Sequence, residues 1–277
     1  HQPRTLPNGV VYATDKALKY SIKNYLKDNY PNDKVFYFKQ YKDDFIPMTL
    51  EESYNTVFPN SQGKEKNTVA KNLLSCLDIR CFGATFAMKS KADGNVAISI
   101  HGPVQINHGV NIWKENNIFS EQIMSPFRNA ADDKKKDDKE DPKEKNATTL
   151  GRQSKLQEGH YLHHFSVNPQ NLQDILKLAG EGASSLSADD ISKLKDALCK
   201  GVTYYDSAAK AGTDNEFLLW VQLKSGSKKV LPNFTQLINL DKVNDKIVLD
   251  LAKVKNITDD NADDIESIEI YYQKESI

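Results

Sequence analysis

The chain has 277 residues, of which 39% are hydrophobic and 27% are charged, and its formal net charge is −1. This near-neutral balance excludes a protein that coats nucleic acid without preference, because that class is usually strongly basic. The sequence contains no apolar run of the roughly 18 to 20 residues that span a bilayer, and its first residues lack the order of a signal peptide. We therefore expect a cytoplasmic protein with one principal domain that carries insertions.

The N-terminal part predicts two helices. One runs over about 14–27, because Thr14 is a typical N-cap and Leu18 and Ile22 recur on one face. The second is expected over 68–77. A loop is predicted between them at 59–67, where polar residues and a glycine cluster.

Strand signals follow. Residues 80–88 and 95–106 flank an Asp93-Gly94 pair, which supplies the left-handed backbone that a tight hairpin needs. A helix is expected over 187–200, since Ser187 and Asp190 form a capping-box pattern and Gly201 is a typical stop. The remaining predicted elements are a strand at 160–167, a helix at 172–178 and strands at 216–224, 246–253 and 267–273.

The longest low-complexity segment is "ADDKKKDDKEDPKEK", residues 131–145, which holds seven acidic residues, six lysines and no large apolar side chain. Such a composition predicts a mobile loop. Residues 256–264 have a similar polar composition and are also expected to form a loop. Taken together, the elements predict an α+β fold, with an antiparallel sheet that carries helices on one face.

Lysines recur along the first predicted helix at steps of three and four residues. At about 100° per residue, Lys16, Lys19, Lys23 and Lys27 fall within one arc, opposite the apolar stripe. An arc of ammonium groups suits the phosphates of a nucleic acid strand. A solvated outer face is the alternative, and the spacing alone favours it.

A second group of polar donors stands in "TTLGRQSK", beside a glycine. Guanidinium, ammonium, amide and hydroxyl groups are all common donors to phosphate or sugar oxygens. The residues concerned are Arg152, Lys155, Gln153, Ser154, Thr148 and Thr149.

Three histidines follow in "GHYLHHF". In an extended strand His160 and His164 face one side and His163 the other, so the three do not converge on one point. The sequence has no H-E-x-x-H, C-x-x-C, G-x-G-x-x-G, Walker or G-x-S-x-G motif. We therefore expect no metal, no cofactor and no catalytic residue.

Five stretches together resemble the repeated backbone subunit of type I CRISPR Cascade complexes, a RAMP protein of the DevR-like group. They are, in chain order, "RTLPNGVVYATDKALKYSIKNYL", "LDIRCFGATFA", "GPVQINHG", "TTLGRQSKLQEGHYLHHFSVNPQ" and "SADDISKLKDALCKG". Their order and spacing follow the family from Arg4 to about Val221. The chain departs from the family in two places. It begins after the family's first strand, so the core sheet is expected to lack one strand, and either a preceding segment is absent from this sequence or another segment completes the sheet. The second departure is the group of histidines in "GHYLHHF".

The resemblance implies a modified RRM or ferredoxin-like palm, with an inserted helical region and a β-hairpin thumb. Residues 1–277 would form a single palm domain with insertions, and about 116–156 the thumb, including the charged loop. Lys16, Lys19 and Lys23 would contact guide phosphates, and Arg152, Gln153 and Lys155 would hold RNA at the thumb base. Met124 and Phe127 are candidate wedges between bases.

The function that the resemblance implies is antiviral defence. The chain would be a non-enzymatic crRNA-binding subunit that polymerises along the guide in a Cascade ribonucleoprotein complex. Its partners would be crRNA, copies of itself, other Cascade subunits and target DNA paired to the guide, with no membrane. The main alternative is a metal-independent RAMP endoribonuclease that processes guide precursor RNA with a histidine base. A duplex-binding transcriptional regulator is a third class, for which the sequence offers no recognition helix.

Overall fold

The computed structural model describes residues 2–61, 65–90, 94–113, 115, 117–124, 150–244 and 246–272. It confirms the predicted α+β class, with antiparallel sheets and several helices. Two compact units make up the chain. The first unit comprises residues 1–13, 108–162 and 239–249, and the second unit comprises 14–107, 163–238 and 250–277. The described part of the chain contains no helix with the length and apolar character that a bilayer span requires.

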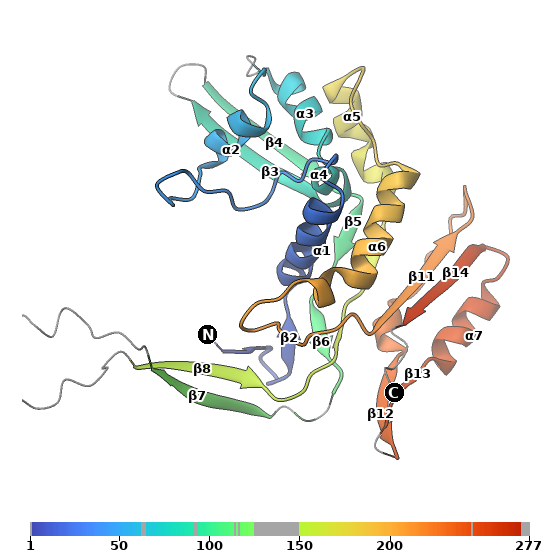
Figure 1. The fold of residues 1–277 in the computed structure, drawn as a ribbon. Coiled ribbons are helices and arrows are strands. Elements are labelled where there is room, and N and C mark those ends of the chain that lie inside the picture. The colour runs from blue at the N-terminus through green and yellow to red at the C-terminus, as the bar shows by residue number, and fades with distance from the viewer. Residues whose placement is uncertain are drawn as a thin grey trace, which may run out of the picture. The chain divides into compact units, whose positions relative to one another are not determined.

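The described residues of the first unit form strands and their connections (Figure 1). Four short strands form one sheet in the order β1-β2-β6-β9, and the longer strands form the two-stranded sheets β7-β8 and β12-β13. The bounds are β1 (Arg4–Thr5), β2 (Val11–Ala13), β6 (Gly109–Asn111), β7 (Ile118–Met124), β8 (Leu150–Leu156), β9 (Tyr161–Leu162), β12 (Asn239–Val243) and β13 (Lys246–Asp250).

The second unit contains the described helices and three antiparallel strand pairs, β3-β4, β5-β10 and β11-β14. Its helices are α1 (Asp15–Asn29), α2 (Leu50–Val57), α3 (Lys66–Leu74), α4 (Leu77–Phe82), η2 (Pro169–Leu172), α5 (Gln173–Ala179), α6 (Ala188–Tyr204), η3 (Phe234–Gln236) and α7 (Ala252–Asp260). Its strands are β3 (Gly83–Ser90), β4 (Gly94–His101), β5 (Val104–Ile106), β10 (Phe165–Val167), β11 (Phe217–Leu223) and β14 (Ile265–Tyr272).

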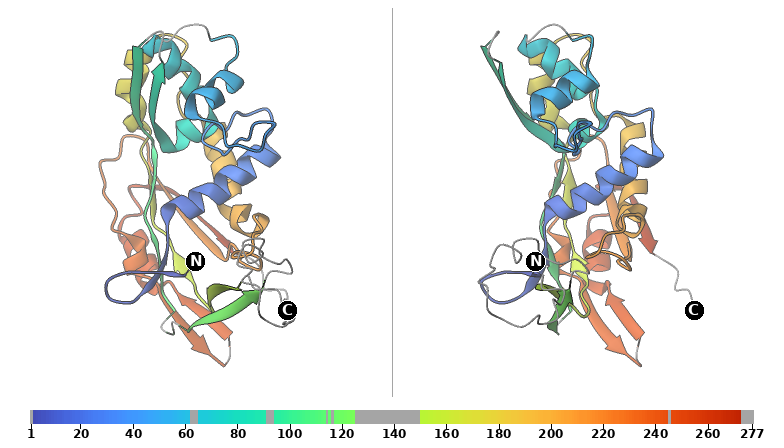
Figure 2. Two further views of the ribbon diagram at one scale, coloured as in Figure 1. Left: turned by 90° about the vertical axis from the view of Figure 1, so that its left-hand side faces the viewer. Right: turned by 60° about the vertical axis from the view of Figure 1, so that its left-hand side comes forward.

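Helices α1 and α6 pack side by side in the second unit (Figures 1 and 2). As predicted, α1 begins after Thr14, whose side chain accepts from the Ala17 amide, and α6 begins with a capping box. The prediction that Gly201 ends α6 is wrong, because the helix continues to Tyr204. A Cβ at Gly201 would stand 3.1 Å from the Ser21 carbonyl oxygen of α1, so this glycine serves close packing of two backbones.

The hairpin β3-β4 forms a hydrophobic core with α2, α3 and α5, which pack on it (Figure 1). The predicted pair of strands is confirmed, but the second strand ends at His101, and residues 104–106 form the separate strand β5. The turn residues 91–93 lie outside the described residues. Phe36, Tyr54 and Phe86 are almost fully buried in this core. Helix α2 was not predicted from the sequence; a capping box between Thr49 and Glu52 starts it.

Gly83 and Gly102, which belong to two of the motif stretches, lie so close together that each position requires a glycine. Gly83 has φ +71°, and a Cβ there would stand 2.2 Å from the Ile100 carbonyl oxygen and 2.4 Å from the Gly102 nitrogen. A Cβ at Gly102 would stand 2.1 Å from the Phe82 carbonyl carbon. The backbones of the two motifs therefore touch, and no larger residue fits at either position.

Several other predicted boundaries are wrong, and the strand expected over 246–253, for example, ends at Asp250. Residues 80–82 belong to α4 and not to a strand, so the strand starts at Gly83. The helix expected over 68–77 ends at Leu74, and the loop expected at 256–264 is largely occupied by α7. In α4, the buried Asp78 carboxylate accepts the amides of Phe36 and Tyr37, each at 2.9 Å, and this contact holds the preceding chain against the helix.

Candidate functional site

The hairpin β7-β8 presents the second group of predicted contact residues. Arg152 pairs with Gln122, Gln153 with Glu121 and Lys155 with Phe119 across the two strands. All residues of β7 are exposed, and Arg152 is exposed as well. The hairpin lies within the segment 116–156 that was expected to form the thumb.

The predicted residues divide between the two faces of this hairpin. Residues directly opposite each other share a face, and faces alternate along a strand. Gln153 and Lys155 therefore lie on one face, while Arg152 lies on the other, together with Met124. Met124 is 69% exposed. The second wedge candidate, Phe127, and the charged loop 131–145 lie outside the described residues.

Lys155 is loosely held. Its Nζ lies 3.5 Å from Oε2 of Glu121, and both side chains are more than 40% exposed. Surface pairs of this kind contribute little to stability, so exchanging the carboxylate for another anion costs little. A phosphate is therefore a suitable partner for this ammonium group.

The lysine arc on α1 is less uniform than its spacing predicted. Lys16 is exposed. The Nζ of Lys19 lies 3.5 Å from Asp15, and its side chain is only 20% exposed. Lys23 donates from Nζ to the Tyr37 carbonyl oxygen at 2.8 Å. Lys16 is thus the most accessible of the three proposed contacts.

Lys23 has an internal role that its position on the arc does not show. Burial lowers the pKa of its ammonium group, although the charge of Asp78 partly compensates. Its Nζ lies over the Tyr37 ring as well, 5.9 Å from the centroid. Lys23 therefore fixes the chain around Tyr37 against α1, in addition to any contact with a ligand.

The histidines do not lie in one continuous strand as predicted. His160 precedes β9, and His163 and His164 lie between β9 and β10, so strict alternation does not apply. Nε2 of His160 lies 3.4 Å from Glu158, and Nδ1 of His163 lies 2.9 Å from the Asn107 carbonyl oxygen. Burial lowers the pKa of His164. Among the described residues, no three histidine, cysteine, aspartate or glutamate side chains form a metal-binding group.

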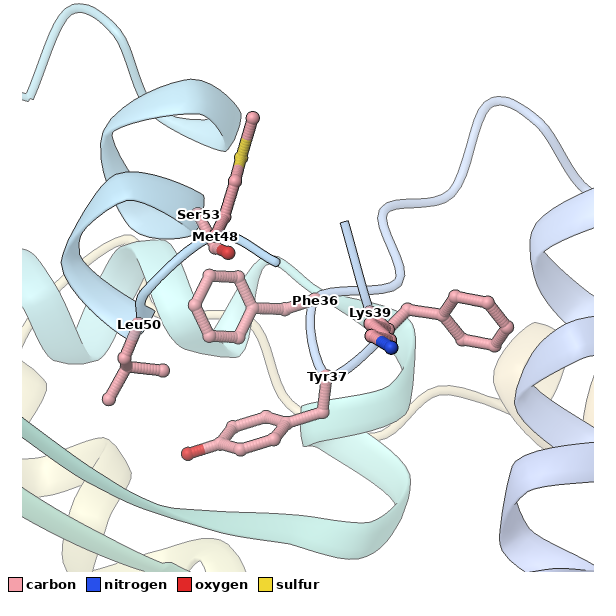
Figure 3. A pocket seen from close by; sticks show the side chains of 7 residues that line it. Phe36, Tyr37, Lys39, Met48, Leu50 and Ser53 are labelled. Carbon is pink, nitrogen blue, oxygen red and sulfur yellow. The ribbon is translucent and has the colours of Figure 1, made fainter. Parts of the chain in front are cut away.

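A pocket in the second unit was not anticipated from the sequence. It has a volume of about 310 Å³, and in Figure 3 the Phe36 ring lies among Met48, Leu50 and Ser53, with the Tyr37 ring extending below it. The mixture of aromatic residues and lysines in "FYFKQYK", residues 36–42, is the sequence feature that could have drawn attention to it. The lining residues are Phe36, Tyr37, Phe38, Lys39, Met48, Leu50 and Ser53.

Comparison with protein families gives a match over almost the whole chain. No curated protein matches the chain significantly. The family model of CRISPR-associated protein Cas7 matches residues 1–273, almost the whole length. This agrees with the resemblance carried by the five sequence stretches. The chain therefore belongs to the Cas7 family of CRISPR-associated proteins.

Proposed function

We propose that this Cas7 family member is a crRNA-binding backbone subunit, which polymerises along the guide in a type I Cascade complex and does not cleave the RNA. The observation that carries the proposal is the match to the Cas7 family over residues 1–273, together with the exposed cations of β8 and α1. Its other partners are copies of itself, further Cascade subunits and the target DNA strand that pairs with the guide.

In this proposal the protein contacts phosphates and sugars, and base pairing supplies specificity. Lys16, Arg152 and Lys155 make the principal phosphate contacts, since they are the more accessible of the proposed cations. Lys19 and Gln153 contribute at the same surfaces, and Lys23 acts mainly by holding Tyr37. Met124 packs against a base from the exposed end of the hairpin.

Fluorescence anisotropy with a labelled single-stranded RNA, measured over a series of salt concentrations, tests these contacts. Each lost phosphate contact should reduce the slope of log affinity against log salt by about 0.7. We expect this reduction for Lys16→Glu and a larger one for Arg152→Glu with Lys155→Glu. Lys177→Glu is the matched control, because Lys177 is 77% exposed on α5 and carries the same charge. Identical slopes for all variants would contradict the assignment.

A further inference from the structure

The aromatic segment beside the pocket is not used by the proposed guide contacts. Residues 36–42 contain four aromatic rings and two lysines within seven positions. Phe36 is almost completely buried, whereas Tyr41 is 54% exposed and Lys39 is exposed at the pocket. The segment thus runs from the core to the surface, with a buried aromatic ring at one end and an exposed one near the other.

Lysine ammonium groups lie over the rings of this segment. Nζ of Lys39 is 4.7 Å from the centroid of the Tyr41 ring, and Nζ of Lys27 is 4.8 Å from the centroid of Phe38. Phe38 in turn stacks on Tyr20 of α1, at 4.9 Å. Cations interleaved with aromatic rings are the side-chain pattern that binds single-stranded nucleic acids.

The loop that follows holds another aromatic ring in solvent. Phe45 is 86% exposed and has φ +63°, a left-handed conformation that is unfavourable for a bulky residue. The Lys42 amide donates to the Ile46 carbonyl oxygen at 2.9 Å, and the Phe45 amide to the Lys42 carbonyl oxygen at 3.0 Å. Lys42 also forms a surface ion pair with Glu52 of α2, at 2.5 Å. A strained, exposed ring that is fixed in this way points to a binding role.

Two carboxylates near this segment have partners within the protein. Glu52 binds Lys42 and accepts the Thr49 amide, and Asp44 accepts the Ile46 amide at 3.0 Å. The charge of Glu52 is therefore partly neutralised, while Lys39 remains exposed. The mouth of the pocket suits a ligand that combines an apolar plane with a negative charge.

We propose that the pocket binds one base of a single-stranded nucleic acid. The base lies against Phe36, Leu50 and Met48, its phosphate is held by Lys39, and the neighbouring bases stack on Tyr41 and Phe45. An apolar protein segment fits less well, because it would remove the Lys39 charge from water without a partner. The site does not depend on the proposed guide contacts, since it uses a different set of side chains.

Photo-crosslinking with two probes tests this site. The probes are a uridine RNA and a thymidine DNA of roughly 12 nucleotides, within the size range of single-strand sites, each carrying one photoreactive base. We expect crosslinked peptides from residues 36–48 with at least one probe. A crosslink with RNA alone identifies a guide strand as the ligand, and one with DNA alone identifies a target or displaced strand.

Variants separate this site from the guide contacts. Lys39→Glu with Tyr41→Ala should reduce the crosslink at 36–48 at least about fivefold, because a stacking ring and a phosphate contact are both lost. Leu50→Trp, which fills the pocket without changing charge, should reduce it similarly. Lys177→Glu should leave it unchanged, and circular dichroism checks that each variant is folded.

Three results would overturn the proposal. One is crosslinking confined to α1 or β8. This result would support the proposed guide contacts and show that the pocket binds no base. Another is an equal crosslink yield at 36–48 in all folded variants. The third is an unchanged yield together with a reduced oligomer mass for Lys39→Glu with Tyr41→Ala, which would assign the pocket to a protein partner.

Discussion

Arg80 and Asp190 form a buried two-point ion pair that joins α4 to α6. Nε of Arg80 lies 2.9 Å from Oδ2 of Asp190, and Nη2 lies 2.7 Å from Oδ1. Nη1 donates to the carbonyl oxygens of Leu74 and Ser75, and Asp190 also accepts the Ser187 amide. The arginine of the "LDIRCFGA" stretch therefore binds the acidic start of α6 directly, and the two motifs stabilise each other.

Removing one partner of this pair should destabilise the protein strongly. Arg80→Ala leaves a carboxylate buried without its counter-charge, so we expect the free energy of unfolding to fall by about 3 to 5 kcal/mol. Urea unfolding followed by circular dichroism measures this change. Lys177→Ala removes only an exposed pair with Asp174 and should change stability little. A similar effect for both variants would show that the Arg80 pair is not a main support of the fold.

The same pair predicts a pH dependence. Burial raises the pKa of Asp190, but hydrogen bonds from Arg80 and Ser187 outweigh burial and hold the pKa below its ordinary value. The stabilisation is therefore complete above the unfolded pKa of about 4 and is lost as the pH falls through the folded value. Thermal melting should show Asp190→Asn less stable than wild type at pH 7, with a difference that shrinks below about pH 4. A difference that stays constant down to about pH 3 would contradict this.

The contact between the two motif glycines predicts a steric effect. Gly102→Ala places a Cβ 2.1 Å from the Phe82 carbonyl carbon, so this variant should fail to fold or lose several kcal/mol, near the upper end for a single substitution. Gly9→Ala is the control, because Gly9 has φ +84° but no atom lies within 4 Å of the position that a Cβ would take there. It should lose only about 1 kcal/mol from backbone strain. Soluble yield and urea midpoints compare the two variants.

The strain at Phe45 predicts a gain in stability on substitution. Phe45→Gly relieves the left-handed backbone and removes a ring that is 86% exposed, so the urea midpoint should rise by the equivalent of about 0.5 to 1 kcal/mol. The same variant should reduce crosslinking of a single-stranded probe at residues 36–48. A loss of stability would mean that the ring packs within the protein.

Local signals in the sequence sufficed for several elements. The cap at Thr14 and the capping box at Ser187 and Asp190 involve residues a few positions apart, so the starts of α1 and α6 followed directly from the sequence. The hairpin β3-β4 followed from two apolar runs around a turn. These features depend on neighbours along the chain, which a sequence pattern displays.

Features set by distant contacts were missed. Glycine commonly follows the end of a helix, but α6 continues past Gly201 to Tyr204. The glycine packs against the Ser21 backbone, a contact that its sequence neighbours do not reveal. Cys81 and Phe82 are apolar enough for a strand, yet Arg80 and Asp78 bind groups more than 40 residues away along the chain and fix a helix there. Likewise, the spacing of the lysines along α1 predicted that Lys23 faces a ligand. It could not show that Lys23 binds the Tyr37 carbonyl oxygen, which lies in a later segment of the chain.

The measurement that tests the central claim most directly is the mass of the complex formed with RNA of two lengths. Native mass spectrometry of the protein with a short and a doubled single-stranded RNA counts the bound copies and detects any cleavage. We predict that the number of copies rises in proportion to the length, with the RNA intact. A single copy on both RNAs, or shortened RNA that His160→Ala, His163→Ala or His164→Ala restores to full length, would contradict a guide-binding scaffold.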